Sequence, residues 1–198
     1  METRSNKLQG RELITIGVFA AIYLVIVTVI GGVCMPIPPL YLLMPAIIAL
    51  LNGTVYMLLL AKVQKRGGIF ILGLMPAVLL MAMGHMWTIL ASCVLCGVLA
   101  ELITGAGKFK SFSRNAIGYC VFSLNLIGAF IPIWVMREFF FADTLRRGMS
   151  VEFIDTLRRM TPLWVLFAML AVTVIAAAIG AVTGRKLLKK HFSKAGII

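Results

Sequence analysis

Six apolar stretches run along the chain, and short polar segments separate them. They cover residues 13–34, 40–61, 69–83, 88–105, 116–136 and 163–182. A helix needs about 20 apolar residues to cross the roughly 30 Å hydrocarbon core of a bilayer, and all six stretches meet or approach that length, the third being the shortest. Helices are expected because lipid offers the backbone no hydrogen-bond partners. The pattern therefore predicts an all-α integral membrane protein with six transmembrane helices.

The third and fourth stretches are joined only by the segment Gly84-His85-Met86-Trp87. If both stretches cross the membrane, these residues must form a tight hairpin. A re-entrant pair of half-crossings is the alternative.

The composition argues against a water-soluble domain. Of the 198 residues, 61% are hydrophobic and 13% are charged, and this charged fraction is about half that of a soluble domain. Disorder and a soluble nucleic-acid binder are disfavoured on the same ground, although the net charge is +12. The basic residues flank the apolar stretches, where they would fix the orientation of a membrane protein. We therefore expect lipid, and no nucleic acid, among the partners.

The basic residues are distributed unequally between the connections. Fourteen of the 19 lysines and arginines fall in the two termini and in the second-to-third and fourth-to-fifth connections. Cytoplasmic segments of membrane proteins carry such an excess, so the sequence predicts a multi-pass protein of the plasma membrane with both termini cytoplasmic. We expect one membrane domain over residues 1–198, with a cytoplasmic N-terminus at 1–11, a long outer loop at 137–162 and a basic cytoplasmic tail at 185–198.

The outer loop contains a short internal duplication. The sequence DTLRR occurs at residues 143–147 and again at 155–159. Between them, Val151, Ile154 and Leu157 recur every three residues after Ser150, a residue type that caps helix starts. We expect a short amphipathic helix at the outer membrane surface. Chance repetition in an arginine-rich segment is the alternative explanation of the duplication.

Motifs of enzymes are absent from the sequence. Because it has no phosphate-binding loop of the Walker type, the chain cannot hydrolyse ATP itself. Its two histidines, His85 and His191, do not form the helical pair of an intramembrane metalloprotease. Cys93 and Cys96 share a helix face, but without a third ligand nearby in the sequence they are more typical of packing. We expect no catalytic site, no metal and no cofactor.

Three polar residues interrupt the apolar stretches. Asn52 and Asn125 lie in mid-stretch, where an amide either bonds across helices or faces a cavity that opens to the outside. Glu101 is the only acid clearly inside a stretch. It is either a coupling or proton-relay acid, or a packing or partner contact near the inner interface.

Aromatic and basic residues gather at the predicted outer boundary. Trp87, Trp134 and Trp164 fall there, which is where interfacial anchors are found. Together with His85 and Arg137, they could also form a ring that stacks on and hydrogen-bonds a flat polar ligand.

Small residues form faces on two of the predicted helices. Gly17 and Ala21 share one face of the first helix, with Ala20 beside them, and Gly180 and Gly184 share a face of the sixth. Such faces let helix backbones approach closely, either within the bundle or against another protein.

Three segments are similar to a known transporter family: NGTVYMLLLAKV at 52–63, RG at 66–67 and AELI at 100–103. With the six apolar stretches and the short first outer loop, they resemble the substrate-binding S components of energy-coupling factor (ECF) transporters. The closer resemblance is to the Trep_Strep or MptD-type group of S components, and it extends over about residues 11–190.

The resemblance implies a subunit that captures a micronutrient, often a vitamin, from outside the cell. The family's pocket is roofed by the first, third and fifth loops, and a transmembrane T component and two ATPase subunits supply energy. Gly17-x-x-x-Ala21 occupies the place of the family's Ala-x-x-x-Ala motif, which faces the T component, and we expect Ala20 in the same interface. Loop 142–161 is long enough to act as a lid. The substrate-binding residues expected on this interpretation are Asn52, His85, Trp87, Asn125, Trp134 and Arg137.

Two functions of other classes stay open at this stage. One is a self-sufficient channel or facilitator for small solutes that works as an oligomer through the Gly180 and Gly184 face. The other is a membrane-embedded structural or assembly factor without a ligand.

Overall fold

The computed structural model describes residues 8–192, and it has no strand within that range. The all-helical prediction is therefore confirmed for the described residues, while parts of the expected termini at 1–11 and 185–198 lie outside them. The elements, in chain order, are α1 (Gly10–Cys34), α2 (Pro38–Lys62), α3 (Gly68–Ala82), α4 (Thr88–Gly105), α5 (Phe112–Ser123), the 3-10 helix η1 (Leu124–Ala129), α6 (Pro132–Val135), α7 (Arg137–Arg146), α8 (Val151–Met160), α9 (Leu163–Leu187) and the π-helical turn η2 (Leu188–Phe192).

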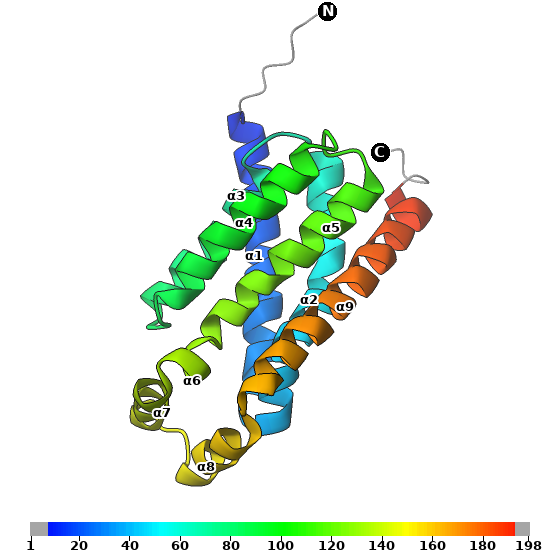
Figure 1. Ribbon diagram of the computed structural model, residues 1–198. Helices are drawn as coiled ribbons and strands as arrows, with labels where there is room; N and C mark the ends of the chain where they lie inside the picture. The colour runs from blue at the N-terminus through cyan, green and yellow to red at the C-terminus, as the bar shows by residue number, and fades with distance from the viewer. Residues whose placement is uncertain (1–7, 193–198) are drawn as a thin grey trace, which may run out of the picture.

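Six of these helices form a bundle in which each packs against two main neighbours. The contacts run from α1 to α2, α9, α5, α4 and α3, and from α3 back to α1, so the ring of helices is closed. Figure 1 shows the start of α1 and the end of α9 at one end of this bundle, and α6, α7 and α8 at the other. The short helices thus cover the end that lies farthest from the termini.

Four helices, α1, α2, α4 and α9, are long and apolar enough to cross a membrane. Helix α3 is equally apolar but has 15 residues, which corresponds to about 22 Å at 1.5 Å per residue. Multiple membrane-crossing helices are therefore supported, and the count of six crossings stays a prediction.

The fifth apolar stretch differs from the expected continuous helix over 116–136. Helix α5 ends at Ser123, η1 follows, and the four-residue helix α6 completes the stretch. Two residues in the interrupted segment are incompatible with a regular helix or require close packing. Gly128 lies so close to α4 that a Cβ atom there would be 2.8 Å from the Thr88 carbonyl oxygen, and Pro132 has no N–H to donate to a preceding turn.

The connection at 137–162 contains two helices, whereas we expected one. Helix α8 is the predicted amphipathic helix, and Ser150 caps it by accepting a hydrogen bond from the Phe153 N–H at 3.2 Å. Its buried face differs from the predicted one, because Phe153 joins Ile154 and Leu157 there while Val151 is exposed. Helix α7 was not predicted. It buries Phe140 and Phe141 against the second hydrophobic cluster of the bundle.

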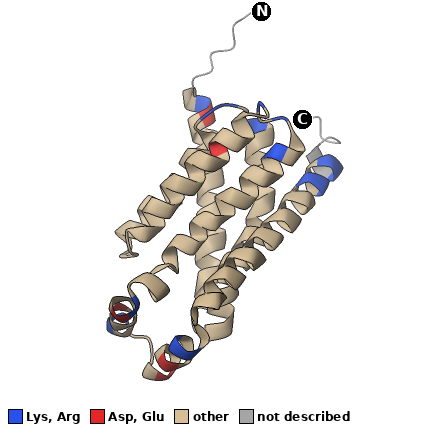
Figure 2. Ribbon diagram, viewed as in Figure 1, with Lys and Arg blue, Asp and Glu red and all other residues tan. Residues whose placement is uncertain are grey.

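Charge is segregated between the two ends of the bundle (Figure 2). The end that holds the start of α1 and the end of α9 carries mainly lysine and arginine, whereas acidic and basic residues are mixed on α7 and α8. This placement follows the unequal distribution seen in the sequence. The side of the membrane on which each end lies stays a prediction.

The glycine face of α9 is used inside the chain. A Cβ at Gly180 would lie 2.7 Å from the Leu50 carbonyl oxygen, and one at Gly184 would lie 2.9 Å from that of Gly53. Both glycines are buried where α9 packs along α2. The face that we considered for oligomerisation of a channel is therefore occupied by α2.

Candidate ligand-binding site

A cavity of about 190 Å³ lies at the end of the bundle that α7 and α8 cover. Three connections meet around it: the turn after α1, the hairpin between α3 and α4, and the segment from η1 to α8. Its aromatic lining residues are Tyr41, Phe130, Phe140 and Phe153. Its methionines are Met35, Met44, Met86 and Met149. Its polar lining residues are His85, Asp143, Thr144 and Arg147.

The aromatic wall is fixed by ring contacts between separate elements. The Tyr41 ring, at the start of α2, lies 4.9 Å from that of Phe130 and 6.0 Å from that of Phe153. Offset and edge contacts at such distances stabilise aromatic pairs by about 1 kcal/mol beyond burial. The wall therefore joins α2, the end of η1 and α8 into one surface.

Helices α7 and α8 are held together by arginines around Phe141. The guanidinium groups of Arg137 and Arg158 lie 5.4 Å and 4.7 Å from the Phe141 ring centroid, within cation–π range. Arg158 also pairs with Glu138 at 3.1 Å, and Arg137 donates to the Thr161 carbonyl at 3.0 Å. These contacts give the two short helices a defined position over the cavity.

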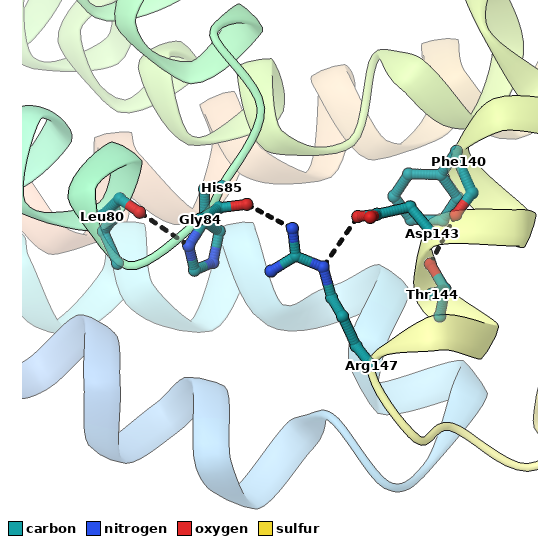
Figure 3. A network of polar contacts seen from close by, with 7 residues as sticks. All are labelled: Leu80, Gly84, His85, Phe140, Asp143, Thr144 and Arg147. Carbon is teal, nitrogen blue, oxygen red and sulfur yellow. Dashed lines mark hydrogen bonds and ion pairs between the residues drawn. The ribbon is translucent and has the colours of Figure 1, made fainter.

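Arg147 links α7 to the hairpin at the mouth of the cavity (Figure 3). Its Nε donates to Asp143 Oδ2 at 2.7 Å, and its Nη2 donates to the carbonyl oxygen of Gly84. Beside it, His85 bonds to the Leu80 carbonyl through Nδ1 at 3.0 Å. The Asp143–Arg147 pair is 28% and 42% exposed, so it contributes at most about 1 kcal/mol to stability. The bond from Arg147 to Gly84, which joins the end of α7 to the hairpin, is also exposed.

The site contains no evident place for a metal. Among residues 8–192, no three His, Cys, Asp or Glu side chains gather closely enough to coordinate one. Within that range the arrangement suits non-covalent binding of a small molecule in an apolar cavity with a few polar groups at its mouth.

A protein-family model matches residues 10–194, nearly the whole chain. That family is described as a hypothetical bacterial integral membrane protein, Trep_Strep. The chain belongs to the Trep_Strep family. Comparison with curated proteins and with solved structures gave no match. Membership confirms the Trep_Strep part of the predicted resemblance and an integral membrane protein, whereas kinship with ECF S components stays a prediction.

The predicted binding residues of this Trep_Strep protein are distributed over several places. His85 lines the cavity. Arg137 fixes α7 to the end of α8, and Trp134 Nε1 donates to the Pro162 carbonyl at 3.2 Å. Trp87 is 64% exposed, as an interfacial anchor would be. Their role in binding stays a prediction, and only His85 among them reaches the cavity wall.

The two mid-stretch amides lie inside the bundle. Asn125 donates to the Phe122 carbonyl at 2.6 Å, which helps to end α5. Asn52 is 1% exposed, and its amide has no hydrogen-bond partner among the described residues. Neither residue lines the cavity.

Sequence reasoning missed Asp143, Thr144 and Arg147. A signal for them was present, because all three belong to the first copy of the DTLRR duplication. The first copy turns polar side chains toward the cavity, whereas the second copy contributes only Leu157. The repeat by itself does not indicate which copy lines a cavity.

Glu101 caps a helix in this Trep_Strep protein. Its carboxylate accepts hydrogen bonds from the backbone N–H groups of Gly67, Ile69 and Phe70 at 2.9–3.1 Å. These groups form the start of α3, where a negative charge is favourable. This geometry supports the packing interpretation of Glu101.

The predicted partner interface is divided between two faces of α1. A Cβ at Gly17 would meet nothing within 4 Å, and Ala21 is exposed. Ala20 is 2% exposed and belongs to the core. Gly17 and Ala21 are thus open to lipid or to another protein, and Ala20 is not.

Proposed function

We propose that this Trep_Strep protein is the substrate-capturing S component of an ECF-type importer for a small micronutrient. It crosses the plasma membrane six times, with both termini in the cytoplasm. It binds its substrate in the cavity under α7 and α8, at the outer end of the bundle. A T component and two ATPase subunits supply the energy, and the chain itself catalyses no reaction.

The cavity is the observation that carries this proposal. It lies at the end opposite the basic end of the bundle, and the basic end is the one expected in the cytoplasm. A cavity in that position receives solutes from outside. Its lining of aromatic and methionine side chains with four polar groups is typical of small-molecule sites.

Helices α7 and α8 act as the lid of this site. They cover the cavity and are joined to the hairpin at its mouth by the contact of Arg147 with Gly84. Breaking this exposed contact lets α7 move away from the hairpin and admits the ligand. Closure afterwards removes the ligand from water, so its polar groups need partners in the protein.

The open face of α1 is the proposed contact with the T component. Gly17 and Ala21 lie there beside the exposed side chains of Ile14 and Val18. A helix with a small-residue face can approach a second transmembrane helix closely. The same face has no partner within the described part of the chain, which leaves room for one.

A ligand screen tests the proposal directly. The purified protein in detergent is heated with vitamins, nucleobases and amino-acid-like solutes, and a ligand at about 100 times its Kd should stabilise it by about 2.7 kcal/mol. Phe140→Leu, which alters the cavity wall, should weaken this protection. Phe139→Leu is the matched control, because the neighbouring Phe139 is 55% exposed and does not line the cavity. Protection by none of the solutes, or equal loss in both variants, would overturn the site.

Copurification tests the partner. Gly17→Leu fills the open face of α1 and should reduce recovery of a coexpressed T component. Ala178→Leu places the same side chain on the exposed face of α9 and should leave recovery unchanged. Equal recovery with both variants would contradict the proposed interface.

A further inference from the structure

We infer that the cavity binds a neutral, single-ring aromatic molecule that carries hydrogen-bond donors, such as an amino-substituted heterocycle. This inference rests on the proposed function, because it names the class of substrate for the same site. Four properties of the cavity lead to it: its size, its walls, its charge and its free polar atoms.

The size of the cavity sets the number of rings. A cavity of 150 Å³ lined by apolar side chains is known to hold one benzene molecule. The cavity described here measures about 190 Å³. It therefore has room for one six-membered ring and a few additional atoms. Because the cavity is partly open, substituents beyond the ring could extend toward solvent.

The walls favour a flat ring over an aliphatic ligand. The rings of Tyr41 and Phe130 are inclined at 49° and those of Tyr41 and Phe153 at 75°, so they form a tilted aromatic wall against which a flat ring can make offset or edge contacts. Four methionines complete the wall. Thioether sulfur makes favourable contacts with aromatic rings and adapts to their shape.

The charge of the lining favours a neutral ligand. Asp143 and Arg147 are the only lining residues with a full charge, and they neutralise each other at 2.7 Å. Because the pair has no net charge, an ionic ligand would give up its hydration in this mostly apolar cavity without meeting an unpaired charge of opposite sign.

The free polar atoms favour hydrogen-bond donors on the ligand. His85 Nδ1 must donate to the Leu80 carbonyl, so Nε2 of the neutral ring is an acceptor. The Thr144 hydroxyl donates its proton to the Phe140 carbonyl at 2.7 Å, which leaves its oxygen as an acceptor. Asp143 bonds to Arg147 through one oxygen, and its second oxygen is a third acceptor. Against these acceptors, Arg147 offers one remaining terminal nitrogen as a donor.

Four probes of one ring size separate these properties. At neutral pH, 4-aminopyrimidine is neutral and has hydrogen-bond donors, and pyrimidine is neutral without donors. Pyrimidine-4-carboxylate is anionic, and 4-(aminomethyl)pyrimidine is cationic. Binding to the purified full chain is measured by calorimetry. We expect 4-aminopyrimidine to bind about tenfold more tightly than pyrimidine, because it adds hydrogen bonds to acceptors already in place, and to bind more tightly than either ion.

One substitution should reverse the preference. Asp143→Asn leaves Arg147 as the only charge of the lining, so the carboxylate probe should gain about tenfold and become the preferred probe. Asp155→Asn is the matched control, because it makes the same change in the second copy of the DTLRR duplication, outside the cavity. An equal shift in both variants would overturn the inference.

The remaining outcomes separate this inference from the proposed function. Preference of the unaltered protein for either ionic probe overturns the ligand class and leaves the cavity as a ligand site. If no probe binds, but the solute screen finds a ligand of another class and Phe140→Leu weakens its binding, the ligand class is also overturned and the cavity remains a ligand site. If neither the probes nor the screen give a ligand, both the inference and the proposed function fail.

Discussion

Replacing Gly180 with alanine should destabilise the bundle, although alanine is the better helix former. In a helix interior, Gly→Ala is worth up to about 1 kcal/mol in favour of folding. At Gly180, however, the new Cβ would lie 2.7 Å from the Leu50 carbonyl oxygen and 2.8 Å from that of Ala49. Both are backbone atoms of α2, so no side-chain rotation can relieve the overlap.

The overlap forces α9 away from α2 along their shared length. Overpacking of this kind costs about 1–3 kcal/mol, and subtracting a helix-propensity gain of about 1 kcal/mol leaves a net loss of up to about 2 kcal/mol. Gly17→Ala is the matched control, because its Cβ would meet nothing within 4 Å. We expect it to change stability by between zero and about 1 kcal/mol in the favourable direction.

The free energy of unfolding of both variants is measured by reversible unfolding in mixed micelles, with SDS as the denaturant. The account requires that Gly180→Ala lower the free energy of unfolding clearly, while Gly17→Ala raises it or leaves it unchanged. If Gly180→Ala is as stable as Gly17→Ala, α9 does not pack on α2 through its glycine face, and that face becomes available for oligomerisation.

Three further substitutions test local contacts. Glu101→Gln should lower the free energy of unfolding by about 1–3 kcal/mol in the same assay, because a neutral amide replaces the carboxylate that accepts three backbone hydrogen bonds at the start of α3. An unchanged free energy of unfolding would refute that cap. Ser150→Ala should cost about 1 kcal/mol and Ser150→Asp should restore it, since only the latter keeps a cap for α8; equal stabilities would argue against the cap. Arg137→Lys should speed hydrogen exchange of the α8 amides, because lysine lacks the planar group that contacts Phe141 and the Thr161 carbonyl together. Unaltered exchange would show that Arg137 does not hold α7 and α8 together.

The long helices could be predicted from the sequence because their signal is local. Runs of apolar residues bounded by charges gave α1, α2, α4 and α9 with ends within a few residues of those observed. The hairpin at Gly84 also follows from the short distance between two such runs. Pro132 indicates a break in the fifth stretch, whereas the close approach of Gly128 to α4 is a tertiary contact that no local pattern encodes.

The cavity was beyond sequence reasoning for a similar reason. Its wall brings Tyr41 to Phe130 and Phe153, three residues from separate elements, and no spacing along the chain encodes that meeting. Arg137 and Arg147 lie in the same loop and look equivalent as sequence. Only the packing of α7 shows that Arg137 fixes α7 to the end of α8 while Arg147 lines the cavity.

Labelling of single cysteines on intact cells tests most directly whether the cavity faces the outside and binds a solute. The four native cysteines are replaced by alanine, and Thr144→Cys or Lys110→Cys is introduced at the two opposite ends of the bundle. The account predicts that a membrane-impermeant maleimide labels Thr144→Cys from outside, that a ligand from the screen protects it, and that Lys110→Cys is labelled only after lysis. Labelling of Lys110→Cys on intact cells, with Thr144→Cys unreactive until lysis, would contradict the account.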